Sequence, residues 1–171
     1  MKREILVYPD KRLREESRDV EAFDERLHAL LEDMKETMYA HEGIGLAAIQ
    51  IGVPKNVLII NLLNEENEQE PEDLYEMVNP VLLDGDGLTT YQEGCLSVPG
   101  YYDEVQRKKE IKVRYFDRDG NKIEREFDGL MAIAFQHELD HLKGHLFIEK
   151  LSYLKRKKFE KDWKKKIKAG S

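Results

Sequence analysis

The sequence predicts an α+β domain in which mainly antiparallel strands surround one buried central helix, with a further helix near each end of the chain. Residues 128–144 follow a helical period and start with a largely apolar stretch, which is typical of a helix at the centre of a domain. Several earlier segments alternate apolar and polar side chains between turn residues, as half-buried strands do. The chain has 171 residues and no internal repeat, so we expect residues 1–171 to form a single domain.

The composition is that of a soluble, globular protein, with a hydrophobic content of 40% and a charged content of 37%. No apolar run reaches the roughly 18 residues that a transmembrane helix needs. The first residues lack the pattern of a signal or transit peptide. Cys95 is the single cysteine, which excludes an internal disulfide and fits a reducing compartment. We therefore expect a cytoplasmic protein without a membrane partner.

The first elements are an extended arm at residues 1–23 and a helix at 25–41. Pro9 interrupts a short apolar run in the arm, which continues as a polar stretch. Asp24 is a good N-cap, and the leucines and methionines after it fall at helical spacing, which predicts the helix. Residues 43–50 then form a glycine-containing, small-residue segment that allows another backbone to approach closely.

The middle of the chain predicts strands, most of which alternate apolar and polar residues. An acidic loop at 64–73 separates the first two strands, and we expect a turn at Gly85-Asp86-Gly87. The sequence Asp-Arg-Asp-Gly-Asn at 117–121 is a clear hairpin signal between the last two strands. The predicted strands are 56–63, 74–83, 88–92, 101–107, 111–116 and 122–127.

The buried helix carries the pattern His-Glu-x-x-His. Asp128 is the expected N-cap and Gly144 the residue that follows the last turn. On a helix, His137 and His141 lie one turn apart on the same face, so that both imidazoles can bind one metal ion. Glu138 lies at the edge of that face, where a carboxylate can take a proton from bound water without being a ligand.

A catalytic metal of this kind needs three protein ligands, so one ligand remains to be found. The residues favour Cys95, because it lies between Gly94 and Pro99 in a loop with little reason to hold a core thiol. One thiolate and two imidazoles suit Zn²⁺, Fe²⁺, Co²⁺ or Ni²⁺ and not Mg²⁺ or Ca²⁺. The alternatives are a carboxylate or one of the histidines His28, His41 and His145.

Residues 150–168 predict a basic C-terminal helix. The net charge of the chain is −7, yet residues 150–171 contain ten Lys and Arg against two acidic residues. Such asymmetry is typical of a protein with a polyanionic partner, although a solvated helix face is the alternative. The expected apolar stripe of this helix consists of Leu151, Leu154, Phe159, Trp163 and Ile167.

Three segments resemble the three motifs of the peptide deformylases. Residues 43–50 fit G-x-G-L-A-A-x-Q, residues 93–97 fit E-G-C-L-S, and residues 136–141 fit Q-H-E-x-D-H. The order and the spacing of the motifs also match, and no motif position departs from the pattern. One motif alone is moderately specific, whereas the three together are very specific.

The resemblance implies a role for individual residues. It assigns Cys95, His137 and His141 as ligands of one divalent metal ion, natively Fe²⁺, which Ni²⁺, Co²⁺ or Zn²⁺ can replace. Glu138 is implied as the general base and then acid. The side-chain amide of Gln50 and the backbone N–H of Leu96 are implied to stabilise the oxyanion. The residues implied to bind substrate are Ile44, Gly45, Gly94, Leu130, Ile133 and Ala134, of which the last three form a pocket for a methionine side chain.

The implied reaction removes the formyl group from the N-terminal formylmethionine of newly synthesised polypeptides. Water activated by the metal and by Glu138 attacks the formyl carbon, and formate and a free amine are released. Bacterial members of the family use a C-terminal helix to dock near the ribosomal exit tunnel, so a bacterial, cytoplasmic enzyme without a DNA partner is expected. The basic residues that this would use are Lys155, Arg156, Lys157, Lys158, Lys161, Lys164, Lys165 and Lys166.

The same residues have three alternative interpretations. A zinc peptidase shares His-Glu-x-x-His but needs a third ligand further along the chain, and His145 is only four residues beyond His141. A thiol hydrolase would use Cys95 as the nucleophile. A binding module would combine a structural metal site with the basic helix, but structural sites usually have four protein ligands.

Overall fold

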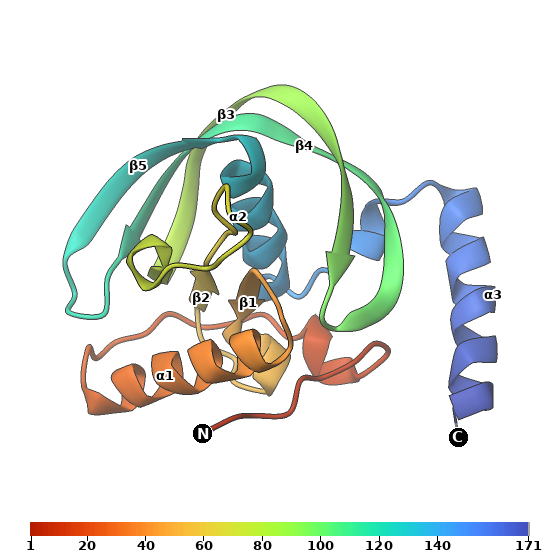
Figure 1. Ribbon diagram of the computed structural model, residues 1–171, viewed down its shortest axis with the longest axis horizontal. Coiled ribbons are helices and arrows are strands. Elements are labelled where there is room, and N and C mark those ends of the chain that lie inside the picture. The colour runs from red at the N-terminus through yellow and green to blue at the C-terminus, as the bar shows by residue number, and fades with distance from the viewer. Residues whose placement is uncertain (171) are drawn as a thin grey trace.

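The computed structural model describes residues 1–170 and has the α+β architecture that the sequence predicts (Figure 1). One five-stranded antiparallel sheet, in the order β1-β2-β3-β4-β5, surrounds helix α2. The strands are β1 (Gly45–Ala47), β2 (Val57–Ile60), β3 (Tyr75–Cys95), β4 (Val98–Phe116) and β5 (Lys122–Asp128). The α-helices are α1 (Glu25–Ala40), α2 (Gly129–Leu142) and α3 (Tyr153–Gly170).

Helices α1 and α2 pack on opposite faces of β1 and β2. Leu58 and Ile60 lie in one apolar cluster with Phe135 of α2, whereas Val57 and Ile59 lie in a second cluster with the α1 side chains. This division follows the alternation of side chains along a strand. All four residues of β2 are buried, so β2 is the central layer between the two helices. Helix α1 is capped as predicted, because the carboxylate of Asp24 accepts hydrogen bonds from two backbone N–H groups.

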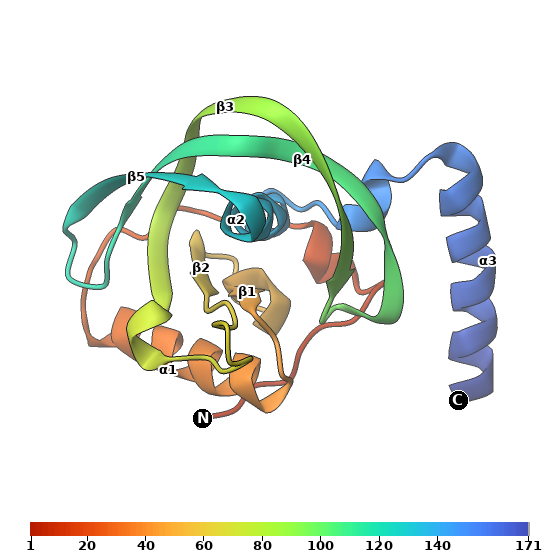
Figure 2. The same ribbon diagram turned by 45° about the horizontal axis from the view of Figure 1, so that its top comes forward.

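Strands β3 and β4 are much longer than the sequence analysis predicts. The expected turn at Gly85-Asp86-Gly87 is wrong, because β3 continues through these residues and Gly85 pairs with Ile111 of β4. Irregularities in the β3–β4 register, between Val78 and Val81 and between Leu82 and Asp84, accompany the bend of the hairpin. The glycines therefore permit curvature here, and the two strands arch over α2 (Figure 2).

The expected cap at the start of α2 is also wrong in detail. Asp128 is the N-cap residue, but its side chain makes no capping hydrogen bond. The reason is that Asp128 is still part of β5, where it pairs with Glu110 of β4. The predicted end of the helix is confirmed, since Gly144 has a φ of 84° immediately after the C-cap Lys143.

Helix α3 lies along one side of the molecule and is anchored by two aromatic residues (Figure 1). Phe159 and Trp163 are buried in a third cluster with Phe147. The predicted apolar stripe is too wide, because Leu154 is 79% exposed and Ile167 is 47% exposed. Leu154 lies five residues before Phe159, and at 3.6 residues per turn that offset turns it away from the buried face. No helix in the described part of the chain has the length and apolar character to cross a membrane.

The packing of α2 predicts where the fold is sensitive to substitution. Phe135 has no exposed surface, so Phe135→Ala is expected to lower the free energy of unfolding by about 3–5 kcal/mol. Leu154→Ala removes an exposed side chain and is expected to change it by less than about 0.5 kcal/mol. Guanidinium unfolding of the metal-loaded variants measures both, and similar values for the two variants would contradict the assignment of the core.

Candidate metal centre

Three potential metal ligands converge between the end of β3 and helix α2. The ligand atoms of Cys95, His137 and His141 lie within 4.8 Å of one another. His141 Nε2 lies 3.1 Å from His137 Nε2 and 3.3 Å from Cys95 Sγ. The helix places the two imidazoles one turn apart, and the β3–β4 hairpin brings the thiol to them, as the sequence predicts. The alternative histidine ligands His28, His41 and His145 instead contact Arg118, Thr37 and Glu149, respectively.

The charges around these three residues favour a cation. Burial by itself lowers the pKa of His137, but its contacts with Cys95, Glu138 and Glu93 outweigh this effect and raise the pKa well above its usual value. The negative charge around His137 suits a divalent cation, which on binding would displace the proton from His137 Nε2. Burial and the neighbouring His137 lower the pKa of His141, which leaves a neutral imidazole able to act as a ligand. One thiolate and two imidazoles fit a borderline transition metal.

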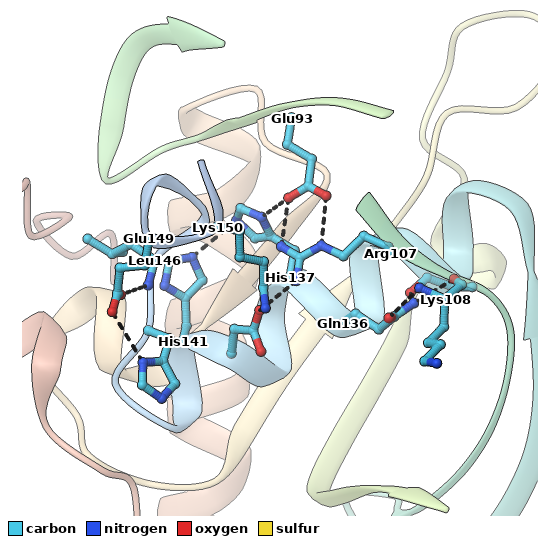
Figure 3. A network of polar contacts seen from close by, with 12 residues as sticks. Glu93, Arg107, Lys108, Gln136, His137, His141, Leu146, Glu149 and Lys150 are labelled. Carbon is cyan, nitrogen blue, oxygen red and sulfur yellow. Dashed lines mark hydrogen bonds and ion pairs between the residues drawn. The ribbon is translucent and has the colours of Figure 1, made fainter. Parts of the chain in front are cut away.

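A network of charged side chains orients the first histidine (Figure 3). His137 Nδ1 donates to Glu93 Oε1 over 2.8 Å, which leaves Nε2 free to bind a metal. Arg107 donates to both oxygens of Glu93 at 2.8 Å, and it also bonds to Asp140 of α2. Burial alone raises the pKa of Glu93, but Arg107 and His137 lower it to about 2, so this carboxyl group is ionised.

Gln50 reaches the site from the segment that follows β1. Its side-chain Oε1 accepts a hydrogen bond from the N–H of Ala47 at 2.9 Å. This contact fixes the amide so that Nε2 donates to Ser97 Oγ at 3.0 Å and lies 3.6 Å from Cys95 Sγ. Gln50 is buried, and its side-chain donor is thereby held beside the potential metal ligands.

Glu138 is buried next to the ligands and close to Gly45. Its Oε1 atom is buried without a hydrogen-bond partner among the described residues. A Cβ atom at Gly45 would lie 2.6 Å from Glu138 Oε2, so a larger residue at position 45 would displace the carboxyl group. Burial raises the pKa of Glu138 to about 7.

A cleft opens at this centre and contains most of the predicted site residues. Its walls come from the segment before β1, the β3–β4 hairpin and α2. His141 does not line the cleft, because it has no exposed surface. The predicted residues that line it are Ile44, Gly45, Gln50, Gly94, Cys95, Leu96, Leu130, Ile133, Ala134, His137 and Glu138.

Sequence reasoning missed the supporting residues Glu93, Ser97, Arg107 and Asp140. Glu93, Ser97 and Asp140 lie within the motifs, and that position is the only signal that marks them. Arg107 lies in a strand and is followed by two lysines, so nothing in the sequence distinguishes it from a solvent-exposed cation.

The centre combines a potential metal site with an adjacent buried carboxylate and side-chain donors in an open cleft. This arrangement defines a metal-dependent hydrolase, because such enzymes pair a metal with a general base beside the substrate. The downstream ligand that a zinc peptidase would require is missing from the described residues around the site, since the cluster contains only Cys95, His137 and His141.

Comparisons with known proteins identify the family. Residues 2–157 match the family described as Polypeptide deformylase. The chain is 53% identical over 165 residues to the peptide deformylase of Nautilia profundicola, covering 96% of this chain and 95% of the relative. It is 51% identical over 169 residues to the peptide deformylase of Campylobacter jejuni, covering 98% and 97%. The structure of a peptide deformylase from Legionella pneumophila superposes with a TM-score of 0.89 at 40% identity, covering 100% of this chain and 99% of that one.

The chain therefore belongs to the peptide deformylase family. It is a metal-dependent hydrolase that removes the N-terminal formyl group from nascent peptides. Relatives from several bacteria match nearly the whole chain.

The buried network predicts a large effect at Arg107, because its removal leaves Glu93 without its guanidinium partner and Asp140 with only the more distant Lys150. Arg107→Met is expected to lower the free energy of unfolding by about 3–5 kcal/mol. It is also expected to weaken metal retention about 10- to 100-fold, since His137 is no longer held in place.

Lys109→Met is the matched control, because it removes the same charge from an exposed position on the same strand. Guanidinium unfolding and competition with a metal chelator measure the two effects. Equal behaviour of the two variants would show that Arg107 does not support the centre.

Proposed function

We propose that residues 1–171 act as one catalytic domain in which Cys95, His137 and His141 hold a single divalent ion. The donor set suits a borderline transition metal, and the resemblance to the family favours Fe²⁺, with Ni²⁺, Co²⁺ or Zn²⁺ as substitutes. Such an ion, when bound, acts as a Lewis acid toward water and the formyl oxygen. The convergence of these three ligands beside the buried Glu138 is the observation that carries the proposal.

The substrate backbone lies between Gly45 and Gly94 and pairs with the cleft edges, as an added strand does. Neither glycine has room for a side chain, because a Cβ atom would meet Glu138 at one position and the ring of Tyr102 at the other. The missing side chains therefore make room for the Glu138 carboxyl group at Gly45 and for the Tyr102 ring at Gly94. The methionine side chain enters the part of the cleft formed by residues one or two turns before His137 on α2, which are Leu130, Ile133 and Ala134.

Glu138 acts as the general base and then as the general acid. Its carboxyl group takes the proton of the attacking water and delivers it to the nitrogen of the leaving amine. The buried position of Glu138 supports this role, because burial raises the pKa of this carboxyl group to about 7, where it can both accept and donate a proton near neutral pH. The products are formate and a peptide with a free α-amino group.

Gln50 and Leu96 stabilise the negative charge that develops on the formyl oxygen. Gln50 is oriented before the substrate binds, since Ala47 and Ser97 already hold its amide. The backbone N–H of Leu96 is the second donor. One donor that is already in place is worth roughly 3–4 kcal/mol in the transition state.

The role of Glu138 is tested with Glu138→Gln, which keeps the size of the side chain but removes the proton acceptor. Formate release from formyl-Met-Ala-Ser is measured with protein loaded with Fe²⁺ or Ni²⁺ without oxygen. The turnover number is expected to fall by about 10²- to 10⁴-fold while the metal content is unchanged. A variant that retains metal and more than about a tenth of the parent rate would exclude Glu138 as the general base.

We also propose that α3 docks on ribosomal RNA near the exit tunnel, which places the reaction in the bacterial cytoplasm. Some basic residues of the helix are already engaged, since Lys155 contacts Asp103, Lys166 contacts Pro99, and Arg156 and Lys157 contact Glu160. The residues available for phosphate contacts are instead the exposed lysines of the outward face, Lys158, Lys161, Lys164 and Lys165.

Docking predicts a salt-dependent affinity for ribosomes. Replacing Lys158, Lys161 and Lys165 together by Ala is expected to reduce the slope of log affinity against log salt by about 3, one for each lost phosphate contact. Co-sedimentation with ribosomes at several salt concentrations measures the slope. Turnover of formyl-Met-Ala-Ser is the control and should not change, because the three lysines do not line the cleft. An unchanged slope would favour a solvated helix face instead.

A further inference from the structure

One side of helix α3 contacts the wall of the substrate cleft. Pro99 and Gly100 line the cleft at the start of β4. Lys166 Nζ donates to the backbone carbonyl of Pro99 over 2.7 Å. A Cβ atom on Gly100 would lie 2.8 Å from the same Nζ, so the lysine lies directly against the start of β4.

We propose that Lys166 is a positioning residue that holds the Pro99–Gly100 wall for substrate binding, and so couples α3 to the cleft. This inference rests on the proposed function, because it takes the cleft as the peptide site. Lys166 does not touch the metal ligands or Glu138. Its effect is therefore expected on substrate binding and not on the chemical step.

A second chain of hydrogen bonds runs from the same helix toward the catalytic amide. Trp163 Nε1 donates to the carbonyl of Tyr8 at 3.0 Å, and the N–H of Tyr8 donates to the carbonyl of Ser97 at 2.8 Å. The hydroxyl of Ser97 in turn accepts from Gln50 Nε2. Lys166 Nζ lies 5.1 Å from the centre of the Trp163 ring. The hydrogen bond to Pro99 and the hydrogen bond to Tyr8 therefore start from neighbouring side chains of α3.

The position of Lys166 separates it from the lysines of the outward face. Phe159, Trp163 and Lys166 follow one another at offsets of four and three residues, which places them on the side of the helix that faces the domain. Lys165 is adjacent in sequence and exposed like Lys166, but its offset of two residues from Trp163 turns it away from the side of the helix that faces the domain. Lys165→Met is therefore a matched control with the same loss of charge on the same helix.

The test compares steady-state kinetics for formyl-Met-Ala-Ser in the full-length, metal-loaded protein. Lys166→Met is expected to raise KM about three- to ten-fold and to leave kcat within about two-fold, as the loss of one solvent-exposed hydrogen bond predicts. Lys166→Arg keeps a donor and should restore KM to within about two-fold of the parent. Lys165→Met should match the parent.

Three kinetic outcomes would overturn the proposal. One is a KM for Lys166→Met that equals the KM of Lys165→Met. A second is a fall in kcat in place of a rise in KM, which would indicate general damage to the fold. A third is a failure of Lys166→Arg to restore KM.

Trp163 gives an independent readout, because it is the only tryptophan in the chain. Titration of formyl-Met-Ala-Ser into a Glu138→Gln background is expected to change its fluorescence, and Lys166→Met in the same background should abolish most of that change. If the peptide leaves the Trp163 fluorescence of the Glu138→Gln protein unchanged, the proposed coupling between α3 and the cleft is wrong. Failure of the parent enzyme to release formate would instead refute the proposed function itself. The fluorescence titration would still report on the link between α3 and the cleft in that case.

Discussion

The buried ion pairs of Arg107 connect the three elements that build the metal centre. Arg107 comes from β4, Glu93 from β3 and Asp140 from α2. The side chains of Arg107 and Glu93 are buried, whereas that of Asp140 is half-buried. Removing these charges from water costs several kcal/mol for each ion, which the short bidentate geometry and the additional bond to His137 offset. A hydrophobic replacement of the set could stabilise the fold as well, but it would leave the His137 ring without a hydrogen-bond acceptor. The network is therefore better explained by the orientation of a ligand than by stability.

The same constraint explains why the centre is assembled from rigid elements. His137 and His141 lie on a helix whose other faces are packed in the main apolar cluster, so neither imidazole can move without disturbing the core. Cys95 is the last residue of β3, and its loop is fixed by the bond between Gln50 and Ser97. Metal sites need ligand positions that are defined before binding, and packed elements supply them better than loops do.

The sequence specifies the local parts of this site better than the distant ones. The one-turn spacing of His137 and His141 follows from helix geometry, and both the fold class and the Cys-His-His cluster match the structure. Arg107 could not be found, because only the long, bent hairpin brings its side chain to Glu93. In the register of that hairpin Arg107 pairs with Thr89 and Glu93 with Asp103. The wrong turn at Gly85–Gly87 has a related cause, since glycine is compatible with both a turn and a bent strand. The sequence alone does not distinguish these, because the choice depends on the pairing of β3 with β4.

The glycines of the motifs show how backbone and catalysis are connected. Gly45 and Gly94 do not have positive φ angles, so their identity is not required by the conformation of the backbone. What excludes a side chain is contact, with Glu138 at one position and with the ring of Tyr102 at the other. A methyl group at position 45 would push the carboxyl group of Glu138 away from the place where it must meet the water. At position 94 the missing side chain makes room for the Tyr102 ring, so each of the two glycines is required by a neighbouring side chain.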